Sequence, residues 1–267
     1  MEVSPIGSGS VPYLQVTEVD KTYSTKGRSD VKALQGVTFS LDEREFVSIL
    51  GPSGCGKSTL LKLVAGLSPV SAGVIEVKGC AVNGPPDNMG IVFQRDVLLD
   101  WLDNLDNVLL PIRYAKLRAA DWTPRALELL TTLGLAGFER RFPWELSGGM
   151  RQRVSICRAL LRNPELLLMD EPFGALDALT RDELNLELQR VWMSQRKTVL
   201  FITHSIAEAV FLSDRVIVMS RNPGRILDIV RVPLPRPRPL GIRETPAFGS
   251  YVARIREMFE KMGLFRG

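Results

Sequence analysis

The chain has 267 residues, a formal net charge of +4, and 45% hydrophobic and 24% charged residues, which is ordinary for a folded soluble protein. This length is enough for one ample core, or for a core and a small subdomain. No window approaches the roughly 18 uninterrupted apolar residues that a membrane-spanning helix needs, so we expect any association with a membrane to go through a partner.

The cysteines and the amino terminus indicate a reducing compartment. Cys55, Cys80 and Cys157 form no C-x-x-C pair and no even framework. The first residues, Met1–Pro5, contain no basic stretch followed by an apolar run, so we do not interpret them as a secretory signal. Residues 1–12 begin with a stretch rich in Ser, Gly and Pro and are predicted to be flexible.

Strands around a phosphate-binding loop are predicted for the first part of the chain. Strands of alternating polarity are expected at Leu14–Val19 and Val37–Leu41. The apolar run Phe46–Leu50 is typical of a buried parallel strand, and a helix is predicted over 57–66. Residues 51–58 lie between them and fit the P-loop pattern G-x-x-x-x-G-K-[ST], in the strand–loop–helix context that this motif requires.

The loop predicts a site for the phosphates of ATP. Its glycines allow backbone N–H groups to point at phosphate oxygens, aided by the positive end of the following helix. Lys57 is expected to reach the β- and γ-phosphates, and Ser58 to offer its hydroxyl to Mg²⁺. The nucleotide-binding residues predicted in this segment are Gly51, Pro52, Ser53, Gly54, Cys55, Gly56, Lys57, Ser58 and Thr59.

Two further strands and a helical stretch follow. The strands are predicted at Val74–Val77 and Met89–Phe93, and residues 96–162 have helical character. Within this stretch Thr123 is predicted as an N-cap, with Pro124 at the first helical position.

Ser147, Gly148 and Gly149 predict a second anion site. They open a predicted helix over Met150–Leu161, with Ser147 as its N-cap, and the glycines leave the first N–H groups uncovered. A chain that already holds ATP on its P-loop has no need of a second γ-phosphate site, unless that site serves another subunit.

Asp170 and Glu171 follow the predicted strand Glu165–Met169. Two acids at a strand end are commonly just solvated, but hydrolysis of ATP needs a metal ion and an activated water as well as a phosphate cradle. A carboxylate at the end of a strand beside the P-loop strand can hold Mg²⁺, which we expect of Asp170. Glu171 is then placed to polarise the attacking water as a general base.

The remaining pattern alternates helices and strands around one core. Thr180 and Glu183 form a capping-box pattern before a helix. Strands are predicted at Thr198–Thr203 and Arg215–Met219, with a helix at Ser205–Leu212 between them.

The tail, residues 221–267, has ten basic and four acidic residues, a net charge of +6 that leaves about −2 for the first 220 residues. It reads either as a solvated, arginine-rich appendage or as an arm that touches a partner or anionic lipid headgroups. Alternating prolines at 233–239 favour an extended segment, and a short helix over 251–262 is expected to dock on the core.

Taken together, the P-loop, Leu146–Met150 and the Asp170–Glu171 pair resemble the ATP-binding cassette (ABC) family over about residues 13–220. The resemblance implies an α/β fold, a P-loop NTPase core (RecA-like) with an antiparallel β subdomain and an inserted α-helical subdomain. The implied parts are the nucleotide-binding core over 13–95 and 163–220, the helical signature subdomain over 96–162, and the basic Pro/Arg-rich tail over 221–267.

The resemblance also implies roles for single residues. Gln94 matches a glutamine that senses Mg²⁺ and the water and contacts the transmembrane partner, and His204, the only histidine, matches one that bonds the γ-phosphate. Asp177 matches the loop that crosses between two cassettes. Tyr23 matches an aromatic that stacks on adenine, although an ordinary strand-end tyrosine is a serious rival. The implied catalytic residues are Glu171, His204, Gln94 and Lys57, and the implied metal ligands are Ser58, Gln94 and Asp170.

Within the family, three segments are similar in sequence to the ATPases of nitrate, sulfonate and taurine importers: the P-loop, residues 147–153 and residues 170–181. This implies a second copy of the chain that shares two ATP molecules, a separate permease, an indirectly coupled solute-binding protein, and a peripheral place on the cytoplasmic face of the inner membrane. Asp100, where proline is expected, and Cys157, where alanine is usual, depart from the pattern. An exporter ATPase, a soluble ABC ATPase acting on nucleic acid or ribosomes, and a P-loop kinase are the alternatives; binding to nucleic acid is not expected.

Overall fold

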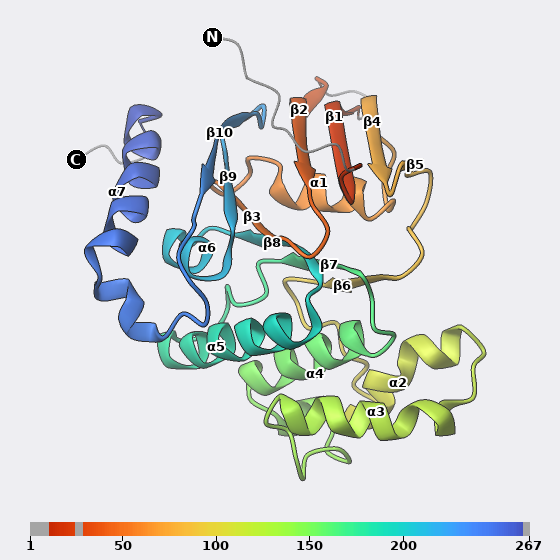
Figure 1. Cartoon of the computed structure of the whole chain (residues 1–267). Coiled ribbons are helices and arrows are strands. Elements are labelled where there is room, and N and C mark those ends of the chain that lie inside the picture. The colour runs from red at the N-terminus through yellow and green to blue at the C-terminus, as the bar shows by residue number, and fades with distance from the viewer. Residues whose placement is uncertain (1–10, 25–28, 264–267) are drawn as a thin grey trace.

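The computed structural model describes residues 11–24 and 29–263, which form two sheets with helices packed around them (Figure 1). Most of the segment predicted to be flexible, residues 1–12, lies outside the described residues. Within the described part of the chain, no helix has both the length and the apolar character needed to cross a membrane.

The larger sheet has six strands in the order β10-β9-β3-β8-β7-β6, all parallel to their neighbours except β10, which is antiparallel to β9. Its strands are β3 (Phe46–Leu50), β6 (Met89–Val92), β7 (Leu166–Asp170), β8 (Thr198–Thr203), β9 (Arg215–Met219) and β10 (Ile226–Arg231). The four central strands, β9, β3, β8 and β7, are almost entirely buried, which explains their near-continuous apolar sequences.

Alternate residues of these strands face two separate cores, because successive side chains of a strand point to opposite faces. Phe46, Leu167, Phe201 and Val216 pack in one core with the helices that lie between residues 104 and 261. Their neighbours Val47, Leu168, Leu200 and Ile217 pack in the other core with α1 (Lys57–Val64) and the smaller sheet. The six-stranded sheet is therefore the wall between two hydrophobic layers, and Figure 1 shows α1 above it and α5 and α4 below it.

The smaller sheet is antiparallel, with four strands in the order β2-β1-β4-β5. Its strands are β1 (Leu14–Tyr23), β2 (Val31–Leu41), β4 (Ala72–Val77) and β5 (Cys80–Ala81). Leu14, Val16 and Val19 of β1 are buried against α1 and the larger sheet, while intervening side chains are partly exposed. The predicted antiparallel β subdomain is thus present, with both early strands longer than their sequence patterns indicate.

The remaining helices pack on the side of the six-stranded sheet that faces away from α1, directly or through one another. They are α2 (Asn104–Tyr114), α3 (Ala119–Thr132), α4 (Gly148–Leu160), α5 (Ala178–Gln195), α6 (Ile206–Leu212) and α7 (Pro246–Lys261), with short 3-10 turns at Pro143–Glu145 and Leu240–Glu244. The first three pack on one another and form the inserted helical part of the chain. The mixed α/β architecture that we predict is confirmed.

Two predicted helix starts are wrong, because both helices begin earlier in the chain than predicted. Helix α3 begins at Ala119, so Thr123 lies inside it and its hydroxyl donates to the carbonyl of Ala119 at 3.0 Å. Helix α5 begins at Ala178, because the carboxylate of Asp177 accepts the N–H of Thr180 at 3.1 Å. The same hydrogen bond lowers the pKa of Asp177.

From the sequence we expect the strand that carries Asp170 to lie beside the P-loop strand, and this expectation is wrong. Strand β8 lies between β3 and β7. The two strands are not adjacent, but both end at the same edge of the sheet, where the Ser58 hydroxyl donates to Asp170 Oδ1 at 2.9 Å.

The tail is part of the fold, and its description as a solvated appendage is wrong. Strand β10 extends the six-stranded sheet, and α7 lies beside β10 in Figure 1 and buries Phe248, Ile255 and Phe259. Arg238 is 1% exposed. Its guanidinium donates to the backbone carbonyls of Val210, Phe211, Ser213, Val232 and Leu234, over 2.8–3.3 Å.

We expect Arg238→Met to destabilise the protein strongly. The substitution leaves several buried carbonyls without a donor, which costs about 3 kcal/mol and corresponds to a fall in Tm of about 6–12 °C. Differential scanning calorimetry checks this, with Arg256→Met, an exposed position on α7, as the matched control. Equal melting temperatures for the two variants would contradict the structural role of the buried arginine.

Candidate functional site

Most of the predicted site residues lie where the parallel strands end. The carboxyl ends of parallel strands meet at one edge of a sheet, where α/β proteins commonly bind ligands. The P-loop follows β3, Gln94 follows β6, Asp170 ends β7 with Glu171 directly after it, and His204 follows β8.

Lys57 is buried at the floor of the P-loop. Its Nζ donates to the carbonyls of Gly51 at 2.9 Å and Pro52 at 3.2 Å, and lies 3.3 Å from Glu171 Oε1. Gly56 has a φ of +95°, and a Cβ at this position would lie 2.9 Å from the carbonyl oxygen of Ala33. Only glycine fits that conformation and that close approach, so the loop geometry requires the last glycine of the motif.

Ser58 and Asp170 form an oxygen-rich pair that fits Mg²⁺. The Ser58 hydroxyl donates to Asp170 Oδ1 at 2.9 Å, and burial raises the pKa of Asp170, so a nearby cation would stabilise its charged form. Hydroxyl and carboxylate oxygens, completed by substrate phosphates, are the donors that Mg²⁺ uses in such sites. When bound, the ion neutralises charge on the phosphate oxygens. Gln94 and Ser58 line one pocket, whose lining does not include Asp170.

Glu171 is held between a cation and an imidazole. Its Oε1 faces Lys57 Nζ, and its Oε2 lies 3.0 Å from His204 Nδ1. The backbone has a φ of +43°, which is rare for a non-glycine residue, and its N–H donates to the carbonyl of Ile202 at 2.9 Å. Strained backbone of this kind clusters at functional sites, and it places this carboxylate at the mouth of the P-loop.

A pocket of about 490 Å³ joins most of these groups. Its lining includes Ser53, Gly54, Gly56, Lys57, Ser58 and Thr59 of the P-loop, together with Tyr23, Gln94 and Glu171. Gly51, Pro52 and Cys55 of the motif do not line it. Cys55 is buried in the core beside α1, and this burial raises the pKa of its thiol.

Three lining residues are absent from our sequence predictions: Val31, Ala33 and Asn222. Asn222 comes from the loop between β9 and β10, which is joined to β2 through the hydrogen bonds of Gly224 with Ala33 and Gln35. Such long-range pairing leaves no local signal around Asn222, so the place of Asn222 in the pocket cannot be predicted from the sequence.

Ser147, Gly148 and Gly149 lie elsewhere. Ser147 caps α4 by accepting the N–H of Met150 at 3.3 Å, as we predict. A Cβ on Gly149 would lie 2.5 Å from Thr180 Cγ2, so this residue packs against the start of α5, beside Asp177. Neither Ser147–Gly149 nor Asp177 lines the P-loop pocket. The structure therefore gathers the predicted residues into two groups.

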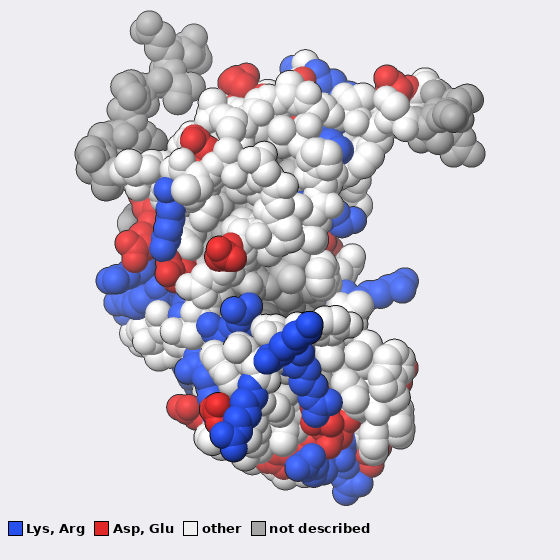
Figure 2. Space-filling view, turned by 90° about the vertical axis from the view of Figure 1, so that its right-hand side faces the viewer, with Lys and Arg blue, Asp and Glu red and all other residues white. Residues whose placement is uncertain are grey.

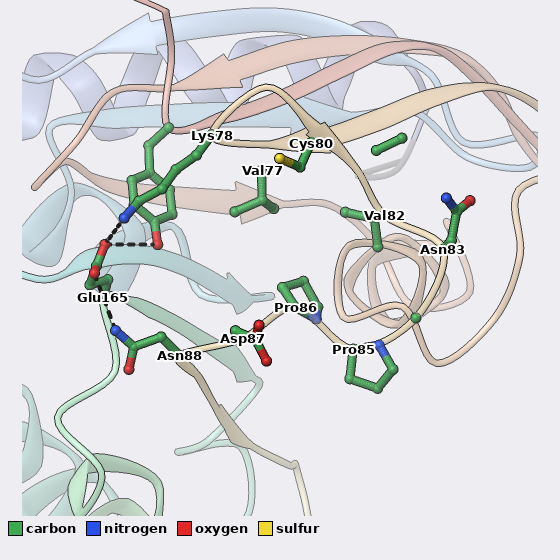
Figure 3. Close-up of a pocket in the computed structure, with 13 residues that line it drawn as sticks. Val77, Lys78, Cys80, Val82, Asn83, Pro85, Pro86, Asp87, Asn88 and Glu165 are labelled. Atoms are coloured by element: carbon green, nitrogen blue, oxygen red, sulfur yellow. Dashed lines mark hydrogen bonds and ion pairs between the residues drawn. The ribbon is translucent and has the colours of Figure 1, made fainter.

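A second pocket, of about 600 Å³, lies at the opposite edge of the six-stranded sheet (Figure 3). Asn88 and Glu165, which precede β6 and β7, meet there with Lys78. Glu165 pairs with Lys78 and accepts from the Asn88 amide at 3.2 Å. None of the predicted site residues lines this pocket.

Comparisons with known proteins point to one family. The family model described as ABC transporter matches residues 34–174. The taurine import ATP-binding protein of Rhizobium johnstonii is 47% identical over 91% of this chain and 95% of its own length. An aliphatic sulfonates import ATP-binding protein of Bacillus cereus is 39% identical over 95% and 98%.

Solved structures agree with these relatives. A dimeric post-hydrolysis structure of an ATP-binding cassette bound to ADP and Pi matches with a TM-score of 0.73 and 33% identity, over 82% of this chain and 98% of that one. A dimeric bacterial ABC transporter cassette matches equally well, at 34% identity. These neighbours confirm the P-loop NTPase fold.

Proposed function

The chain belongs to the ABC transporter family, and we propose on this premise that it drives uptake of a small anion or organic solute of the nitrate, sulfonate or taurine type. It is an ATPase whose hydrolysis is coupled to transport. The observation that carries the import proposal is the similarity over nearly full length to two import ATP-binding proteins, named for taurine and for aliphatic sulfonates.

In this proposal the chemistry takes place at the P-loop edge. Lys57 and the loop N–H groups bind the β- and γ-phosphates, Ser58, Asp170 and Gln94 hold Mg²⁺, and Tyr23 stacks on adenine. Glu171 accepts the proton of the attacking water, and His204 orients that carboxylate and bonds the γ-phosphate. The contacts of Glu171 with Lys57 and His204 support this assignment.

We propose that Ser147, Gly148 and Gly149 bind the γ-phosphate held by a second copy of the chain, and that the Asp177 loop lies at the same junction. Their separation from the P-loop pocket of their own chain supports a shared site. So does the similarity to cassettes solved as dimers. In this proposal residues 13–95 and 163–220 form the core that binds the chain's own ATP. Residues 96–162 form the unit that carries Ser147–Gly149, the segment that binds the ATP of the second copy.

The permease would dock on a groove of about 340 Å³ beside Gln94. This groove lies between β6, α2 and α4 and combines apolar and cationic side chains, among them Phe93, Val97, Leu110, Pro111, Arg158 and Arg162. Figure 2 shows Lys and Arg side chains over the lower part of this side of the molecule, where Figure 1 places α2 and α3. The chain would then sit peripherally on the cytoplasmic face of the inner membrane, with a solute-binding protein on the other side.

We expect Val97→Asp to weaken coupling to the permease about tenfold, because a charge buried without a partner in an apolar contact is unfavourable. Val97 is 50% exposed, with a φ of +44° that Asp tolerates better than a β-branched residue. The Tm should therefore not fall. Copurification and permease-stimulated ATP turnover measure the effect, with Val97→Thr as the uncharged control; full stimulation of the Asp variant would place the permease elsewhere.

Reconstitution with the permease and binding protein of the same transport system tests the proposal. Taurine, an alkanesulfonate or nitrate should stimulate ATP turnover only when the binding protein is present on the outer side. Stimulation by a solute presented from the ATPase side would favour an exporter. Tight, salt-sensitive binding to nucleic acid would favour a soluble ABC ATPase instead.

A further inference from the structure

Glu208 is a buried carboxylate close to the proposed site, to which no role has been given so far. It lies on α6, one turn after His204, and is 5% exposed. Burial raises its pKa, while a hydrogen bond from Thr203 and the positive charge of Arg181 oppose that rise. A buried carboxylate needs partners of this kind. The two partners of Glu208 connect it to the turn of His204 and to the loop of Asp177.

Thr203 connects Glu208 to the backbone on both sides of His204. Thr203 ends β8, and its hydroxyl donates to Glu208 Oε2 at 2.5 Å. The Thr203 hydroxyl oxygen also accepts the N–H of Ser205 at 2.9 Å. His204 lies between these two residues, so the hydroxyl of Thr203 fixes the turn from which the imidazole reaches Glu171.

Arg181 connects Glu208 to the loop before α5. Its Nε lies 3.4 Å from Glu208 Oε1, and its Nη2 donates to the carbonyl of Leu176 at 2.8 Å. Leu176 directly precedes Asp177, the cap of α5. A continuous series of polar contacts therefore runs from this loop through Arg181, Glu208 and Thr203 to the turn of His204.

The tail holds the other end of α6. Arg238 donates to the carbonyls of Val210 and Phe211 in the last turn of that helix, and Arg236 donates to the carbonyl of Leu212 at 2.6 Å. With its carboxyl end fixed in this way, α6 is a rigid support, so a change at Glu208 would be felt at His204 rather than absorbed by movement of the helix.

We propose that Glu208 and Arg181 are positioning residues that set the orientation of His204 against Glu171 and transmit displacement of the Asp177 loop to it. This inference rests on the proposed role of His204 in ATP hydrolysis. Glu208 touches neither ATP nor water in this account and positions His204 through its hydrogen bond with Thr203. Contact of a second copy with the Asp177 loop would thereby adjust the hydrolytic residues of the first.

The single histidine gives a direct test. In protein labelled with ¹⁵N-histidine, His204 supplies the only imidazole signals, which are recorded without nucleotide for the wild type, Glu208→Gln and Arg181→Met. Steady-state ATP turnover of the same proteins gives kcat and KM. Glu183→Gln is the matched control, because it removes a carboxylate that pairs with Arg153 from the first two turns of α5 but lies outside this series of contacts.

Both variants are expected to shift the imidazole signals in the same direction and to lower kcat by about 10- to 100-fold, with KM for ATP changed less than threefold. The double variant should be no worse than the single ones, because the two residues act as one unit. Arg181 is 29% exposed, so Arg181→Met keeps the test available if Glu208→Gln does not fold. Folded variants with wild-type imidazole signals would overturn the proposal, even if turnover fell, whereas a wild-type chain without ATP turnover would instead refute the proposed function.

Discussion

Glu171→Gln is expected to lower ATP turnover by about 10²- to 10⁴-fold, the usual contribution of a general base, while ATP still binds. The amide keeps the shape of the side chain and its contact with His204, but it cannot accept the proton of the attacking water. Since hydrolysis is then blocked after the two copies have closed on ATP, the closed dimer should accumulate. Single-turnover kinetics and light scattering with Mg·ATP measure the two effects.

Glu165→Gln is the matched control for this variant. Glu165 belongs to the same region of the chain and is also an ion-paired carboxylate, but it lies at the opposite edge of the sheet. The Glu165→Gln variant should therefore leave ATP turnover unchanged. Normal turnover by Glu171→Gln would show that another group activates the water, and loss of ATP binding would show that the variant damages the pocket itself.

The second large effect is expected for Ser147→Asp. Asp is as good an N-cap as Ser, so α4 should remain intact and one chain should still bind ATP. The added carboxylate would face the γ-phosphate held by the second copy, and the hydroxyl donor would be lost. We expect turnover to fall by about 10²- to 10³-fold, with no ATP-dependent dimer, as measured by turnover assays, ATP binding and light scattering.

Two controls separate charge from capping in this experiment. Ser147→Asn keeps the cap without the charge and should have a much smaller effect. Thr245 caps α7, and its hydroxyl accepts the N–H of Phe248. The variant Thr245→Asp changes this cap and should have no effect on dimerisation. A Ser147→Asp chain that still forms tight dimers on ATP would argue against a shared site.

Local signals in the sequence were sufficient for most of the core. The strands Phe46–Leu50, Thr198–Thr203 and Arg215–Met219 are observed at their predicted bounds, since short apolar runs ending at polar residues are typical of buried parallel strands. The P-loop and the cap at Ser147 were predictable for the same reason, because each depends on residues close together in the chain.

Features set by long-range packing were not predictable. The place of β8 between β3 and β7, the pairing of β10 with β9, and Asn222 in the pocket all depend on contacts between distant segments. Arg238 shows the same limit. Among alternating prolines and arginines it resembles a solvated residue, and only the carbonyls at the end of α6 give it a buried place.

The shared site itself is tested most directly by cross-linking between two introduced cysteines, one in each of two chains. Cys55 and Cys157 are buried, so replacing the exposed Cys80 with Ser leaves a suitable background. One chain then carries Ser147→Cys, and a second, distinguishable chain carries Ser53→Cys on the P-loop. We predict that a short bifunctional thiol reagent joins the two different chains when ATP is bound to a Glu171→Gln background, and not in its absence. ATP binding without any such intermolecular product would contradict the account.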